Sequence, residues 1–65
     1  MAQVNGVARA DVIGMPLDEL LAAEGYDPCR VACEADGEIV ARANYHAHRI
    51  AADEQLEIVS FVGGG

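Results

Sequence analysis

The chain has 65 residues, of which 52% are hydrophobic, and its eleven acidic and four basic residues give a formal net charge of −7. A chain of this size makes one small domain and offers little material for a deep ligand pocket, so we do not expect an independent enzyme. The scarcity of basic groups makes nucleic acid and anionic membrane surfaces poor partners, while the acidity serves either solubility or steering toward a basic protein surface.

The N-terminal half predicts a β-hairpin followed by a helix. Asn5-Gly6 lies between two short apolar segments and tolerates the positive φ angles of a tight turn. A helix is predicted across residues 15–25, because Pro16 suits its first turn, three leucines form an apolar stripe, and Gly25 provides a left-handed C-terminal stop. No Ser, Thr, Asp or Asn directly precedes Pro16, so we expect no side-chain cap.

The C-terminal half predicts three further strands. Residues 30–35 and 38–42 are predicted strands joined by the tight turn Asp36-Gly37, and β-branched content predicts a last strand over 56–62. The segment 43–48 has no clean period and is predicted to be a short helical turn or loop. This order predicts an α+β fold, in which a mixed β-sheet packs on one main helix and the first and last strands lie side by side.

The last strand carries an unusual apolar face. Leu56 and Ile58 share one face, so that if they enter the core, Val59 and Phe61 point outward. Either strand twist or an oligomer contact covers these two residues, or they form an exposed apolar patch that docks a partner.

The chain ends in Gly63, Gly64 and Gly65. Because glycines have no side chain to pack, we expect a flexible tail over residues 63–65 after a domain of residues 1–62. Such a tail can enter a narrow channel, where its α-carboxylate can attack the α-phosphate of ATP and give an acyl-adenylate open to a sulfur or amine nucleophile. A frayed terminus is the alternative interpretation.

The cysteines and histidines do not predict a metal site. Cys29 and Cys33 have the spacing C-x₃-C, which differs from the C-x-x-C of redox pairs and zinc sites, and we expect Cys33 to be a small core hydrophobe. His46 and His48 lack a Cys or carboxylate at a recognisable spacing, so we expect a surface role for both.

No catalytic residue is predicted either. The adjacent acids Asp18-Glu19 and Asp53-Glu54 are expected to be exposed helix and turn residues rather than a catalytic pair. The sequence contains no phosphate-binding glycine loop and no nucleophile elbow. The absence of a signal-peptide pattern and of an apolar stretch near ~18 residues predicts a cytoplasmic protein with reduced cysteines.

Taken as a whole, the chain resembles the ThiS-type sulfur carriers of thiamine biosynthesis, which have the ubiquitin-like β-grasp fold. The residues that carry the resemblance, in order, are Val4-Asn5-Gly6, Leu17-Asp18-Glu19-Leu20-Leu21, Arg30-Val31-Ala32, Gly37-Glu38-Ile39-Val40, Arg42, Tyr45 and the run from Leu56 to Gly65. The departures are Pro16 for a capping threonine, Asp36 for asparagine, Ala41 for proline and Asp53 for a turn glycine. They concern turns and caps, and the diglycine end is intact.

The resemblance implies a co-substrate that is not an enzyme and binds no cofactor itself. An E1-like adenylyltransferase of the ThiF type would use ATP and magnesium to adenylate Gly65, and sulfur from a cysteine desulfurase relay would convert this end to a thiocarboxylate. A thiazole synthase of the ThiG type would then take the sulfur into the thiazole of thiamine. The tail residues that would thread into the partner active site are Gly63 and Gly64, and the partner-facing residues would be Val59, Phe61 and Val62.

Three other functions are compatible with the sequence. A carrier of the same fold could serve another pathway, such as molybdopterin, cysteine or a secondary metabolite. A binding module could dock a partner through the apolar patch with no covalent chemistry at the tail. A small metal-handling protein is the most distant option.

Overall fold

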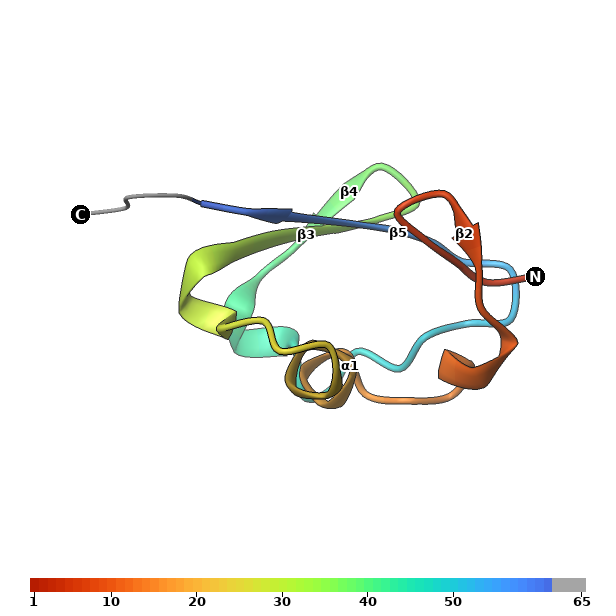
Figure 1. Cartoon of the computed structure of the whole chain (residues 1–65), viewed down its shortest axis with the longest axis horizontal. Helices are drawn as coiled ribbons and strands as arrows, with labels where there is room; N and C mark the ends of the chain where they lie inside the picture. The colour runs from red at the N-terminus through yellow and green to blue at the C-terminus, as the bar shows by residue number, and fades with distance from the viewer. Residues whose placement is uncertain (62–65) are drawn as a thin grey trace.

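A computed structural model describes residues 1–61 and has two layers, a mixed β-sheet and the helix α1, Leu17–Ala23, which lies across one face of it (Figure 1). The sheet order is β2-β1-β5-β3-β4. The strands are β1 Gln3–Val4, β2 Val7–Ala8, β3 Val31–Ala35, β4 Glu38–Val40 and β5 Gln55–Ser60, and the 3₁₀ turns are η1 Ala10–Val12, η2 Pro28–Arg30 and η3 Arg42–Asn44. This arrangement confirms the predicted α+β fold, while most strands are shorter than predicted.

Strand β5 occupies the centre of the sheet. It pairs in parallel with β1 and antiparallel with β3, so the first and last strands lie side by side as predicted. A parallel pair requires a crossover connection, and α1 lies on that connection. Pairing in the first hairpin stops at Ala8, because the next residues turn into η1 and bury Val12 under the sheet.

Both predicted tight turns are present. Asn5 and Gly6 have φ angles of 50° and 82°, and Asp36 and Gly37 have φ angles of 51° and 85°. Asp36 tolerates this left-handed conformation, and its Oδ1 accepts a hydrogen bond of 2.9 Å from the backbone N–H of Gln55. The side chain of Asp36 therefore ties its turn to the start of β5.

Helix α1 has no side-chain cap, as predicted, and is capped by distant backbone instead. The N–H of Leu17 donates to the carbonyl of His48 at 2.8 Å, and the N–H of Asp18 donates to the carbonyl of Tyr45 at 3.2 Å. These carbonyls satisfy donors that a helix start otherwise leaves unpaired. The loop that follows η3 thus caps the helix N-terminus in place of a side chain. Within residues 1–61, no helix has the length and apolar character needed to cross a bilayer.

The core lies between α1 and the inner face of the sheet. Its buried hydrophobic residues are Ala2, Val4, Val12, Leu17, Leu20, Leu21, Val31, Cys33, Tyr45, Ile50, Leu56 and Ile58. Cys33 lies in it beside Tyr45, which confirms the prediction of a core cysteine; burial raises the pKa of the Cys33 thiol and that of the Tyr45 hydroxyl. Cys29 is exposed on η2, so the two free thiols occupy different environments.

The side chain of Asn5 joins the first turn to β5. Its Oδ1 accepts a hydrogen bond of 2.7 Å from the N–H of Ile58, and its Nδ2 donates one of 3.3 Å to the carbonyl of the same residue. The paired residues of β1 and β5 end at Val4 and Leu56, and the backbone N–H of Asn5 then donates to the carbonyl of Leu56 at 2.9 Å. The side-chain amide of Asn5 therefore takes the place of a further residue of β1 and extends the hydrogen bonding along β5 to Ile58.

Replacing Asn5 with glycine should lower the free energy of unfolding by about 1–2 kcal/mol, because it removes both hydrogen bonds and leaves the N–H of Ile58 without this partner. Glycine keeps the positive φ, so Asn5→Gly isolates the side-chain contribution. Asn5→Ala should cost about 1–2 kcal/mol more, since alanine is strained at that angle. Urea unfolding curves measure both values, and a wild-type midpoint for Asn5→Gly would contradict the role assigned to the amide.

Cys29 should react quickly with a thiol reagent in the native protein, whereas Cys33 should react only as the protein unfolds. Because burial raises the pKa of Cys33, its thiolate is scarcer at neutral pH than that of an ordinary cysteine, and labelling should increase as the pH rises toward that pKa. A Cys29→Ser variant isolates the buried thiol. Rapid labelling of this variant in native buffer would show that Cys33 is not in the core.

Candidate docking surface and tail

Strand β5 leads directly toward the predicted tail. Its pairing with β3 ends at Val31 opposite Ser60, and the N–H of Phe61 then donates to the carbonyl of Arg30 at 2.7 Å. The chain is therefore fixed by backbone hydrogen bonds up to Phe61. The four remaining predicted site residues lie outside the described residues, as does the predicted boundary between the domain and the tail; they are Val62, Gly63, Gly64 and Gly65.

The outward-facing residues of β5 make an apolar surface beside this end. The side chains of Leu56 and Ile58 are buried on the inner face of the sheet, whereas those of Val59 and Phe61 are 58% and 51% exposed, as alternation predicts. Strand twist does not cover them within the chain. Ile39 on β4 is also exposed, and sequence reasoning missed it because both Ile39 and Val40 could have faced the core.

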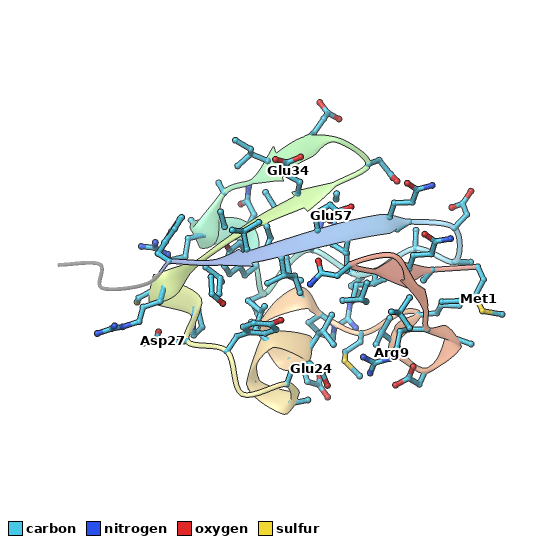
Figure 2. All side chains as sticks on the ribbon, turned by 45° about the horizontal axis from the view of Figure 1, so that its top comes forward. Met1, Arg9, Glu24, Asp27, Glu34 and Glu57 are labelled. Carbon is cyan, nitrogen blue, oxygen red and sulfur yellow. The ribbon has the colours of Figure 1, made fainter. Side chains whose placement is uncertain are left out.

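The outer face of the sheet also carries an acidic row, farther from the end of β5. Glu57 on β5 lies directly opposite Glu34 on β3, and Figure 2 shows both on neighbouring strands. Like charges directly opposite each other destabilise a sheet. The next outward row toward the end of β5 pairs Val59 with Ala32 and is apolar. A partner that approaches this face therefore meets acidic and apolar groups in sequence along one strand.

One expectation about the acidic residues is wrong. Glu54 was expected to be exposed, but it is only 4% exposed. Its position is in phase with Leu56 and Ile58, so its side chain points inward, and this alternation was the available signal. Its Oε1 accepts from the N–H of Ala51 at 3.1 Å, and its Oε2 lies 2.7 Å from Nε2 of His48. The carboxylate closes the loop before β5.

The two histidines have separate partners. His48 is half-buried against Glu54, which corrects the expected surface role, whereas His46 is exposed and its Nδ1 lies 3.0 Å from Oδ2 of Asp18. The two imidazoles therefore contact carboxylates from different parts of the fold. Among residues 1–61, no group of three or more His, Cys, Asp and Glu side chains could hold a metal ion.

Comparison with known proteins agrees with this fold. The family model described as the ThiS family matches residues 2–65. The crystal structure of a thiamine biosynthesis protein (ThiS) from Geobacter metallireducens superposes with a TM-score of 0.76 at 27% sequence identity, and the match covers 98% of this chain and 97% of that one. The likeness thus extends over both whole chains.

Two curated relatives are longer proteins. Each is named thiazole synthase, one from Magnetococcus marinus and one from Paramagnetospirillum magneticum, and each is 37% identical over 62 residues. The match covers 95% of this chain and 19% of the relative, so the chain spans about a fifth of their length. The family match and the shared fold confirm the resemblance found in the sequence: the chain belongs to the ThiS family, the thiamine-related sulfur carriers with the ubiquitin-like β-grasp fold.

Proposed function

We propose that this chain carries sulfur as a thiocarboxylate on Gly65 and donates it to the thiazole of thiamine. Membership in the ThiS family supports this proposal. The observation that carries it is the position of β5: this central strand ends at Ser60, and the exposed side chains of Val59 and Phe61 lie close in sequence to the three terminal glycines. A partner can bind this apolar surface while its active site binds the last residues of the chain.

The proposed reaction begins at the terminal carboxylate. One oxygen of the Gly65 carboxylate attacks the α-phosphorus of ATP, the bond between the α- and β-phosphates breaks, and pyrophosphate leaves. A sulfur nucleophile, formally hydrosulfide supplied by a cysteine desulfurase relay, then attacks the carbonyl carbon, and AMP leaves with the electrons of the broken C–O bond. The product is the thiocarboxylate. The ATP and magnesium belong to an E1-like adenylyltransferase of the ThiF type, so this chain acts as co-substrate rather than catalyst.

The glycines suit this chemistry because they have no Cβ. A channel narrow enough to exclude water from an acyl-adenylate has little room for side chains, and glycine allows a close backbone approach. Gly63 and Gly64 would fill this channel and Gly65 would present the reacting carboxylate.

The acceptor of the sulfur is proposed to be a thiazole synthase of the ThiG type. The support is that relatives named thiazole synthase contain a region 37% identical to this chain within a longer polypeptide. A fused carrier and synthase would keep the sulfur donor at high effective concentration beside its acceptor. The synthase must contact the carrier through a surface, for which Val59 and Phe61 are suited because aromatic and apolar anchors contribute most to such interfaces.

Incubation of the full chain with ATP, magnesium and the adenylyltransferase should release pyrophosphate and add an adenylate to the intact mass. Deleting Gly65 should abolish both signals, because the shortened chain ends one residue short of the reacting phosphate. Addition of the desulfurase and cysteine should replace one oxygen by sulfur, and addition of thiazole synthase should consume the thiocarboxylate. Full sulfur transfer by a chain whose C-terminus is capped as an amide would overturn the proposal.

Replacing Phe61 with alanine should raise the KM for the carrier in adenylation by about 10-fold, the size of an ordinary interface anchor, while kcat stays unchanged. Phe61 is half exposed, so the thermal midpoint should move little. Val7→Ala is the matched control, because Val7 is also exposed but lies on β2 at the edge of the sheet. Equal KM values for the two variants would exclude Phe61 from the interface.

A further inference from the structure

The four arginines of this acidic chain differ in how strongly their side chains are bound within the fold. Arg9 is held by Asp11 at 2.8 and 2.9 Å and by Glu24 at 3.2 Å, and the hydrogen bonds from its guanidinium lower the pKa of Asp11. Arg49 donates to the carbonyl of Gly14 at 3.1 Å. Both of these arginines therefore tie segments of the fold together.

Arg30 and Arg42 lie at the end of the molecule where β5 ends. They belong to η2 and η3, which Figure 1 places together at that end, and Nε of Arg42 donates to the carbonyl of Pro28 in η2 at 3.1 Å. The carbonyl of Arg30 accepts the hydrogen bond from Phe61. Two segments distant in sequence thus lie together near Phe61, and each carries an arginine.

These two arginines are accessible to a partner. The side chain of Arg30 is 68% exposed, and its nearest carboxylate, Asp27, is 3.7 Å away and also exposed. Such an ion pair contributes little in water and is readily exchanged. The hydrogen bond of Arg42 uses Nε and is itself exposed. Both residues therefore differ from Arg9, whose guanidinium is held by two carboxylates.

Charge changes sign along β5 toward the tail. The acidic row of Glu57 and Glu34 comes first, the apolar row of Val59 and Ala32 follows, and the last pair brings Phe61 opposite Arg30. In a chain of net charge −7, most of the surface repels an acidic partner. An approach that brings Arg30 and Arg42 toward such a partner offers it positive charge.

We propose that Arg30 and Arg42 form a cationic collar at the root of the tail, which binds carboxylate side chains at the mouth of the partner channel that receives the tail. The proposal rests on the proposed function, because a channel for the tail is part of it. Guanidinium groups attract carboxylates through their positive charge, and complementary charge acts mainly on encounter and orientation. The collar therefore governs binding of the carrier and leaves the chemical step at Gly65 unchanged.

The test compares the double variant Arg30→Gln, Arg42→Gln with Arg49→Gln in adenylation assays at low and high ionic strength. At low ionic strength the double variant should raise the KM for the carrier about 3- to 10-fold with kcat unchanged, and its KM should depend less on salt than that of the wild type. Arg49→Gln removes a charge away from the collar and should stay within about twofold of the wild type. If the double glutamine variant and the wild type have the same KM and the same salt dependence, the proposal is overturned.

Two further measurements separate charge from folding and from the proposed function. The double variant Arg30→Lys, Arg42→Lys keeps the charge and should recover most of the wild-type KM; if it is as impaired as the glutamine variant, the collar does not act through charge. Binding of fluorescently labelled carrier to the adenylyltransferase without ATP should show the same ranking. If the wild type binds more tightly than the glutamine variant but is never adenylated, the proposed function alone is contradicted. If the wild type and the variants are all adenylated and bind equally well, the collar alone is contradicted.

Discussion

The parallel pairing of β1 with β5 is the constraint on which the rest of the structure depends. It joins the two ends of the chain, and the Asn5 amide extends it by holding both backbone groups of Ile58. Helix α1 spans only Leu17–Ala23, too short to be stable in water by itself, so it persists because its leucines pack on the sheet that this pairing closes. Loss of the pairing would expose the inner face of β5 and release the helix.

The same constraint positions the functional end. The last residues of β5 are hydrogen-bonded to β3 alone, because the pairing with β1 ends at Leu56 and the Asn5 side chain reaches only Ile58. The backbone N–H of Phe61 donates to the carbonyl of Arg30, and the side chain of Phe61 is half exposed. The proposed carrier thus presents an exposed aromatic side chain shortly before a chain end of three glycines.

The departures from the family pattern are compensated by contacts at a distance. Pro16 offers no capping hydroxyl, and the carbonyls of Tyr45 and His48 pair with the first helical N–H groups instead. Asp36 replaces an asparagine in a left-handed position and still accepts a hydrogen bond from Gln55. On the outer face, Glu34 and Glu57 lie directly opposite each other, and like charges in this arrangement destabilise a sheet.

Local chemistry determined the tight turns at Asn5-Gly6 and Asp36-Gly37, the leucine stripe of α1 and the outward direction of Phe61, because each follows from a few neighbouring residues and the period of a helix or strand. Resemblance along the ordered chain gave the family. The tertiary structure alone decided that His48 meets Glu54, that distant carbonyls cap α1, and that Arg42 binds the carbonyl of Pro28. Each of these joins segments far apart in sequence, and no local pattern encodes which surfaces the folded sheet brings together.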